Sequence, residues 1–147
     1  MDRDTASPVW PSAAPPDAPP GQVWPLEHVS QLPRVRAQLR RHLVESVGDP
    51  DSPRAAELVD RVVLAFDEMA SNALRHGGAG VVARVAPHER SWLVEVCDSA
   101  AVSPPTPAIG RDPSQGGLGL YLIAEMSTAH GWHTVGGSKS VWALLPR

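Results

Sequence analysis

The sequence predicts an α+β domain, a two-layer sandwich in which one mostly antiparallel sheet carries helices on one face. Two stretches, residues 28–47 and 54–76, place apolar residues at helical spacing. Two pairs of β-rich segments, 81–98 and 132–145, lie before and after a third helical stretch. The order helix, helix, strand, strand, long loop, helix, strand, strand is typical of helices packed on one side of a sheet.

Composition restricts the class of protein further. The chain has 147 residues, which is enough for one domain with a substantial core, and its net charge is −3. This charge offers no basic excess for nucleic acid or an anionic membrane surface. Cys97 is the single cysteine, so no internal disulfide can form and a cytoplasmic location is expected. No run of residues approaches the ~20 apolar residues of a membrane span.

The N-terminal segment is dominated by proline. Seven of the 16 prolines lie in the first 25 residues, and the start of the chain lacks the apolar core of a signal peptide. Because proline lacks the amide donor, we expect residues 1–25 to be a disordered tail and residues 26–147 to form the folded domain. The pattern VWP occurs at 9–11 and again at 23–25. We favour chance; the alternative is a pair of aromatic anchors that dock on a partner or on the domain itself.

The predicted elements follow in order along the chain. The first helix, 28–47, has arginines on its polar side, and GDPDSPR then ends it and caps the next helix, Arg54 to His76, which stops at two glycines. The segments GVVARVA and SWLVEVCD are joined by PHER and predict an antiparallel hairpin. A proline-rich loop, 99–115, precedes a helix of about residues 118–129, and the strands WHTV and KSVWALL close the domain.

The second helix carries an unusual polar pair. One side of it is apolar and predicts a core face, whereas Glu68 and Asn72 point together from the other side, one turn apart. Most such pairs are simply solvated. Ala65 and Leu64 flank this face, however, which indicates that the pair is covered rather than fully exposed to water.

Two further segments carry residues suited to binding a ligand. Asp98 continues the strand face of Trp92, Val94 and Val96, where an acid is costly unless something hydrogen-bonds to it; alternatively it caps a turn beyond the strand. The loop that follows is longer than compact domains usually keep without a use. The glycines of GGLGL, 116–120, open a helix, and free backbone amides there favour an anion such as phosphate. Together these features predict a nucleotide site.

The motifs EMASNALRHG, VEVCD and GGLGLYLI, in this order and spacing, resemble those of the GHKL (Bergerat-fold) ATPase superfamily. This superfamily includes gyrase-type ATPases and the catalytic domains of histidine kinases. The small size and the ending GGSKSVWALLP look most like its anti-sigma-factor serine/threonine kinase branch, especially short ATP-binding regulators of actinobacteria. The resemblance covers residues 32–146, and E-x-x-x-N followed by A-x-x-H-G is its most specific element.

The resemblance implies a site for ATP and Mg²⁺. Asn72 would give its amide oxygen to Mg²⁺, which prefers hard oxygen ligands. Glu68 would be the general base for an attacking serine hydroxyl. Asp98 would accept a hydrogen bond from the exocyclic amine of adenine and so select adenine over guanine. The remaining ATP contacts would be Gly116, Gly117, Leu118, Gly119 and Ser140, with residues 99–115 as the lid and Arg111 as a phosphate contact.

The function that the resemblance implies is a kinase that transfers the γ-phosphate of ATP to Ser or Thr of an antagonist protein. It would also sequester a partner such as a sigma factor, as a homodimer, without contacting nucleic acid or a membrane. The family's D-x-G is here Asp98-Ser99-Ala100, and the usual threonine of the last strand falls at Lys139. These departures keep open a non-catalytic protein-binding module with a degenerate or weak ATP site. A third possibility is a stand-alone ATPase or a histidine-kinase remnant.

Overall fold

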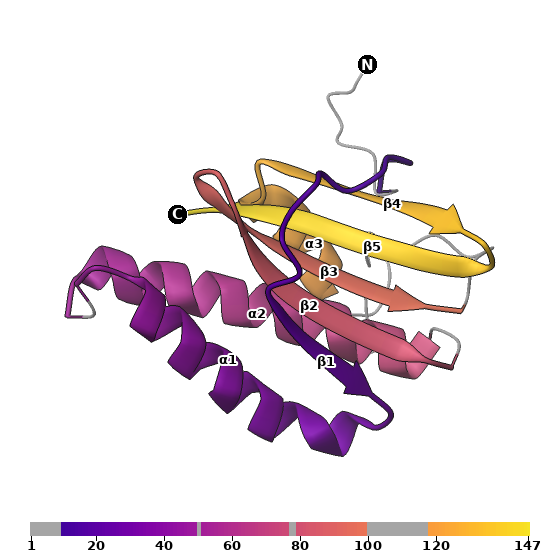
Figure 1. Ribbon diagram of the computed structural model, residues 1–147, viewed down its shortest axis with the longest axis horizontal. Coiled ribbons are helices and arrows are strands. Elements are labelled where there is room, and N and C mark those ends of the chain that lie inside the picture. Colours follow the sequence, from indigo (N-terminus) through magenta and orange to yellow (C-terminus); the bar gives the residue numbers. More distant parts are fainter. Residues whose placement is uncertain (1–9, 50, 77–78, 100–117) are drawn as a thin grey trace.

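The computed structural model describes residues 10–49, 51–76, 79–99 and 118–147. Its elements are β1 (Gln22–Leu26), a short 3-10 helix η1 (Val29–Gln31), α1 (Leu32–Ser46), α2 (Pro53–His76), β2 (Val81–His88), β3 (Ser91–Asp98), α3 (Leu118–Met126), β4 (Ala129–Val135) and β5 (Ser138–Pro146). The strands form one five-stranded sheet in the order β1-β2-β3-β5-β4, and all four neighbouring pairs are antiparallel (Figure 1). The predicted α+β class is confirmed.

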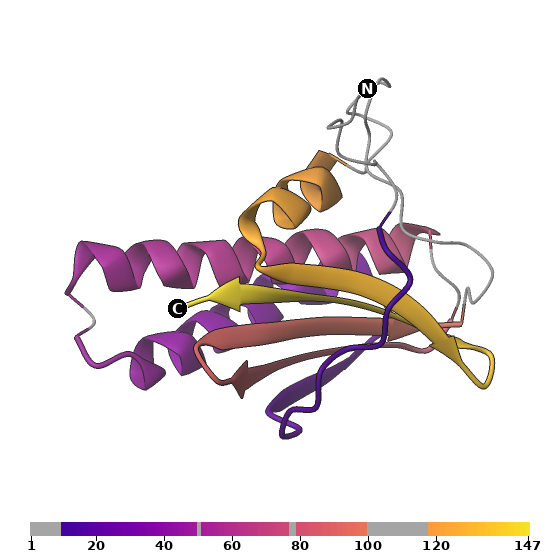
Figure 2. The ribbon, with the colours of Figure 1, turned by 90° about the horizontal axis from the view of Figure 1, so that it is seen from above.

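Helix α2 is the centre of the helical layer. It packs against β2 and β3, with α1 on one side of it and α3 on the other, and the three helices lie on one face of the sheet (Figure 2). Its apolar positions recur at helical spacing and are buried in the core: Val59, Val62, Val63, Ala65, Phe66, Met69, Ala70 and Ala73. The helix that the sequence predicts from Arg54 to His76 is therefore present, and it begins one residue earlier, at Pro53.

The hairpin of β2 and β3 forms where the sequence predicts it. A two-residue turn joins the strands, and Glu89 takes a positive φ of 51° there. Trp92, Val94 and Val96 of β3 belong to the core cluster beneath the helices. Because alternate residues of a strand face opposite sides, Asp98 faces the same helical layer.

Strand β1 was not predicted. It pairs with the outer edge of β2, with Trp24 opposite Ala83 and Pro25 opposite Val82. Proline is tolerated there because β1 is an edge strand, whose outward N–H groups need no partner. Trp24 reaches the helical layer: its indole N–H donates to the Gln38 side chain at 3.0 Å, and its ring meets Phe66 edge-on at 5.3 Å.

The segment before β1, residues 10–21, is called the N-terminal strap. It crosses the sheet face opposite the helices, from β4 to β1 (Figures 1 and 2). Ser12 makes a parallel bridge with Trp132 on the outer edge of β4. Gly21 turns the strap into β1 with a φ of 67°, and a side chain there would overlap the backbone of Val85 and Ala86. The N-terminal segment thus covers both edges of the sheet, β2 through β1 and β4 through the strap.

These observations differ from the expected disordered tail over residues 1–25. Within the described part of that segment, Trp10 is 2% exposed and lies in the main core cluster. The two VWP tryptophans, Trp10 and Trp24, therefore dock on the domain itself, which was the alternative to a chance repeat. Residues 1–9, including Val9, lie outside the described residues. This order was not predicted because a high proline content indicates only an extended backbone with few N–H donors. The carbonyl oxygens of such a segment can still accept hydrogen bonds, and here the sheet supplies the donors.

Candidate nucleotide site

The C-terminal half of α2 presents the predicted polar pair. Glu68 and Asn72 are both half-buried, although the residues between them are buried in the core. The covering that the sequence indicated is therefore partial: Ala65 is fully buried, whereas Leu64 is exposed. A polar pair held half-buried on a rigid helix is suited to binding, because its position is set by the core face of the same helix.

The start of α3 lies directly against Glu68. Gly119 is in the first turn of α3, and a Cβ added to it would overlap the Glu68 carboxylate. No larger residue fits there unless the Glu68 side chain moves. Gly119 of the glycine motif and Glu68 of the E-x-x-x-N motif, which are about 50 residues apart in the sequence, therefore lie next to each other in space.

The environment of Glu68 favours its protonated form. Burial raises the pKa of the Glu68 carboxyl above its ordinary value, and the negative charge of Asp67 raises this pKa further. The positive charge of Arg75 acts in the opposite direction. Asp67 itself binds Arg36 of α1 at 2.7 Å and so faces away from the predicted site toward the other helix. A carboxyl with a raised pKa is suited to proton transfer near neutral pH.

Asp98 lies at the end of β3 on the helix-facing side and is 2% exposed. Lys139 is directly opposite it on β5, is 6% exposed, and places its Nζ atom 3.9 Å from Asp98 Oδ2. The prediction that an acid on this apolar face needs a partner is confirmed, since Asp98 forms an ion pair. The alternative, a turn cap beyond the strand, does not apply because Asp98 is still within β3.

Lys139 is the residue of this region that the sequence reasoning did not place in the site. A signal for it was present, because Lys139 shares strand parity with Val141, Ala143 and Leu145, which are all buried. A lysine that continues such a row must be buried next to an acid or must end the strand. The pairing of β3 with β5 decides this, and the sequence alone does not show which two strands are neighbours.

Ser140 does not join Asp98. It is opposite Cys97 in the register and faces the other side of the sheet, where its hydroxyl donates to the Glu95 carboxylate. The structure therefore separates Ser140 from the site that was predicted for it, because neighbouring strand residues point to opposite faces. Ala100, Arg111, Gly116 and Gly117 lie outside the described residues, as does most of the predicted lid; of Leu118, only its place at the start of α3 is described.

The donor atoms of this region suit a metal ion that keeps waters and phosphate oxygens. Among the described residues, no three His, Cys, Asp or Glu side chains gather in a way that could hold a metal ion. An amide oxygen at Asn72 beside a carboxylate at Glu68 would instead give Mg²⁺ one or two protein ligands, which is its usual number in nucleotide sites. The residues present therefore fit the ion that the resemblance implies.

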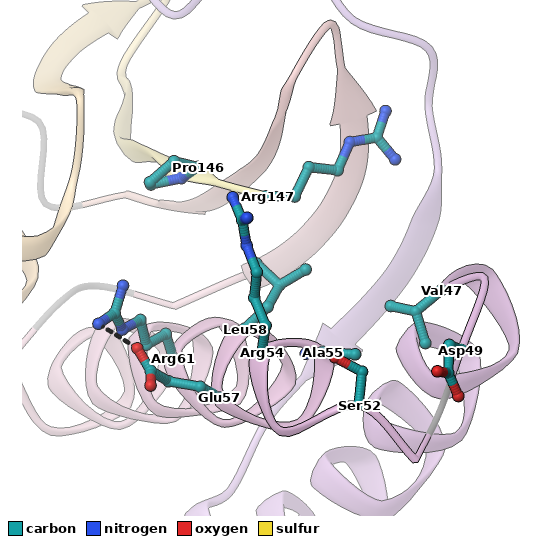
Figure 3. A pocket seen from close by; sticks show the side chains of 10 residues that line it. All are labelled: Val47, Asp49, Ser52, Arg54, Ala55, Glu57, Leu58, Arg61, Pro146 and Arg147. Atoms are coloured by element: carbon teal, nitrogen blue, oxygen red, sulfur yellow. Dashed lines mark hydrogen bonds and ion pairs between the residues drawn. The ribbon is translucent and has the colours of Figure 1, made fainter.

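A separate pocket lies at the other end of α2, with a volume of about 350 Å³. Ala55, Leu58 and Pro146 form apolar parts of its lining, and Glu57 pairs with Arg61 at 2.5 Å (Figure 3). None of the predicted site residues lines this pocket. It is therefore distinct from the region around Glu68 and Asp98.

The comparisons with known proteins identify the family of this domain. A family model described as "Histidine kinase-like ATPase domain" matches residues 27–144. The chain belongs to this family. The predicted membership of the GHKL superfamily is thereby confirmed for this histidine kinase-like ATPase domain. The strap and β1 precede the matched residues, so they lie outside the part that the family model describes.

Two solved structures are similar to the histidine kinase-like ATPase domain. One is the crystal structure of the RsbU and RsbW domains of Rv1364c from Mycobacterium tuberculosis, with a TM-score of 0.57 and 19% identity; the match covers 85% of this chain and 32% of that one. The other is the histidine kinase AdeS of Acinetobacter baumannii, with a TM-score of 0.44, 12% identity, and coverage of 86% and 68%. The first likeness supports the fold, and this chain spans only about a third of that protein (32%).

No match was found among curated protein sequences. In the described part of the chain, no helix has the length and apolar character needed to cross a bilayer.

Proposed function

We propose that the chain binds ATP with Mg²⁺ between α2, the end of β3 and the start of α3. In this proposal it transfers the γ-phosphate to a serine or threonine of an antagonist protein. It acts as an anti-sigma-factor-type regulator in the cytoplasm, works as a homodimer, and sequesters a partner such as a sigma factor. The family supports an ATP site, and the kinase step and the partner are what the proposal adds.

One observation carries the proposal: the helix start at Gly119 lies against the Glu68 carboxylate. A helix N-terminus attracts phosphate through its free N–H groups and its dipole. A phosphate bound there would lie beside the carboxylate proposed as the base and one turn from the amide proposed as the metal ligand. The contact supports the proposal because it puts the start of α3 beside Glu68, which is one helical turn from Asn72.

The proposed chemistry assigns one role to each side chain. Glu68 takes the proton of the substrate hydroxyl while the hydroxyl oxygen bonds to the γ-phosphorus and the bond to the β-phosphate oxygen breaks, so that ADP leaves. Asn72 would hold Mg²⁺, and the ion would supply positive charge to offset that of the phosphates. Asp98 accepts a hydrogen bond from the exocyclic amine of adenine. The raised pKa of Glu68 makes its carboxylate a stronger base.

The test is phosphate transfer from radiolabelled Mg-ATP to candidate antagonist-domain proteins. We expect Glu68→Gln to transfer at least about 100-fold more slowly than wild type, the typical contribution of a general base. Asp60→Asn is the matched control, because Asp60 is another acid of α2 but binds Arg40 of α1; we expect it to retain transfer. Equal transfer by Glu68→Gln and wild type would show that the assigned mechanism is wrong.

The Asp98–Lys139 ion pair favours a second candidate function. An ammonium beside Asp98 competes with adenine for the same carboxylate, which supports a non-catalytic protein-binding module with a weak or degenerate ATP site. Titration calorimetry separates the two functions. Micromolar, Mg²⁺-dependent ATP binding that is lost in Asn72→Ala would rule out the second candidate, and no measurable binding would favour it. Phosphate release without any partner would instead indicate a stand-alone ATPase.

A further inference from the structure

The sheet face opposite the helices carries a row of polar side chains that includes two hydrogen-bond donors, Arg84 and Trp142. Arg84, Glu95 and Trp142 lie side by side on β2, β3 and β5 in the register of the sheet. The Glu95 carboxylate accepts from Arg84 Nε at 2.9 Å and from Arg84 Nη2 at 2.8 Å, which fixes the guanidinium in place. Glu95 is only 9% exposed and also accepts from Ser140, so this arrangement is built into the sheet rather than solvated.

The N-terminal strap satisfies these donors with its main-chain carbonyls. Arg84 Nη1 donates to Pro19 O at 2.8 Å, and Trp142 Nε1 donates to Ala13 O at 2.8 Å. His88 Nδ1 donates to Asp17 O at 3.1 Å. In these contacts the sheet donates to carbonyl oxygens of the strap and not to its side chains. A proline-rich segment suits them well, because proline keeps its carbonyl, lacks an N–H that would need a partner, and favours an extended backbone.

The strap is anchored at the edge of β4. Trp132 N donates to Pro11 O at 3.0 Å, and Ala13 N donates back to Trp132 O at 2.9 Å. Just before this bridge, the Trp10 ring is buried edge-on against His130, with ring centres 4.8 Å apart. The Trp10 indole N–H has no hydrogen-bond partner among the described residues. The aromatic anchor is therefore held by packing alone, at the cost of one unsatisfied donor.

We propose that this face is a binding surface for proline-rich extended segments, and that residues 10–21 occupy it in cis. The trans partner is a proline-rich segment with an aromatic residue just before its first surface-bound proline. Extended, proline-rich segments dock on surfaces with aromatic side chains, and here the Trp142 indole and the Arg84 guanidinium donate to carbonyls of such a segment. The strap shows that the surface accepts such a segment over its whole width. The inference does not depend on nucleotide binding.

The test uses the full chain and a fluorescein-labelled peptide of residues 7–21, followed by fluorescence anisotropy. In Ala13→Pro the strap loses its N–H bond to Trp132 O, and the exposed position of Ala13 spares the core. We expect this variant to bind the peptide at least tenfold more tightly than wild type, because in wild type the tethered strap competes at an effective concentration on the order of millimolar. Equal binding by the two proteins, or no binding by either, would overturn the proposal.

A second substitution tests the donors themselves. In the Ala13→Pro background, Trp142→Phe keeps an aromatic ring at this position and removes the indole N–H; we expect peptide affinity to fall about fivefold, the effect of one neutral hydrogen bond. Trp132→Phe is the matched control, since Trp132 packs against the helix-side core and its backbone bonds survive; we expect unchanged affinity. If both variants bind like the parent, the Trp142 indole does not donate to the peptide and the proposal is wrong.

The peptide can be varied in the same way. Phenylalanine in place of the peptide tryptophan removes the unsatisfied N–H, so this peptide should bind at least as tightly. Alanine in place of the four prolines from 15 to 20 should weaken binding at least tenfold; if it does not, the surface does not select proline-rich chains. Light scattering tests whether a second copy of the chain occupies the surface instead. An Ala13→Pro assembly that is larger than that of wild type, and that excess peptide fails to dissociate, would assign the surface to a second copy of the chain and overturn the proposed partner.

Discussion

Gly119 of α3 lies so close to Glu68 of α2 that a single added methyl group would overlap the carboxylate. The atoms that it would meet belong to the flexible end of the Glu68 side chain, which can move away. This contact therefore constrains where the carboxylate lies more strongly than it constrains the fold. A substitution at Gly119 should therefore affect phosphate transfer more strongly than it affects stability.

For Gly119→Ala we expect little change in stability and a large loss of phosphate transfer. Alanine favours a helix over glycine by about 1 kcal/mol, which offsets the cost of moving the glutamate. A displaced base costs at least about tenfold in rate, because transfer depends on sub-ångström positioning. Urea unfolding and the transfer assay measure the two effects. A strong loss of stability would show instead that the contact is part of the core.

The pKa of Glu68 predicts a pH dependence of stability. Because burial raises its folded-state pKa, the protonated form stabilises the fold, and this contribution is lost as the pH rises through the folded pKa. We expect Glu68→Gln to gain melting temperature relative to wild type between pH 4 and pH 8. The measurement is the melting temperature of both proteins across this range. A constant difference between them would contradict the prediction.

The Asp98–Lys139 pair predicts strong coupling between two buried charges. Asp98→Asn or Lys139→Met alone leaves one charge without this partner, which destabilises proteins by on the order of 3 kcal/mol. The double substitution removes both charges, so its loss should be smaller than the sum of the single losses. A double-mutant cycle by denaturant unfolding measures the difference. Additive losses would show that the two side chains act independently.

The lowered pKa of His130 predicts that acid weakens its contact with Trp10, the aromatic anchor of the strap. Burial lowers the pKa of its imidazole below the ordinary 6.5, so the folded state disfavours the charged ring that Trp10 packs against. As the pH falls below 6.5, the unfolded chain takes up a proton that the folded chain resists, and stability is lost. We expect His130→Gln to lose less melting temperature than wild type between pH 7.5 and 5. A parallel decline in both proteins would contradict this.

Cys97 should react slowly with alkylating reagents. Burial, and then the negative charge of Glu95, raise the pKa of the thiol from 9.0 to about 11. The thiolate is the reactive form, so a shift of this size lowers its population about 100-fold near pH 8. Labelling with iodoacetamide, followed by mass spectrometry, should be slow in the native protein and fast in urea. Rapid native labelling would show that the strap side of β3 opens readily.

Much of the helical layer could be predicted because its signals are local. The apolar spacing of α2, the glycines after it, and the alternation along β3 each indicate an element without knowledge of the others. Glu68 and Gly119 could also be assigned to one nucleotide site, from their residue types and from the family resemblance. Their contact depends on how α3 packs on α2, which no local pattern in the sequence determines.

The remaining features depend on pairing between distant strands. β1 was missed because Pro25 argues against a strand unless that strand is known to be at an edge. Ser140 was assigned to the nucleotide site and Lys139 was not, because a one-residue difference in register exchanges the two faces of β5. The strap was missed for a related reason: its stability comes from donors on β2 and β5 that its own sequence does not reveal.

The position of the strap affects how shortened forms of this protein should be designed. A fragment begun at residue 27, where the family match starts, would lack β1 and the bridge at Ser12. Both outermost strands would then present unpaired backbone groups, a common route to self-association. Aggregation of such a fragment would reflect the missing N-terminal residues rather than an intrinsic instability of the ATPase fold.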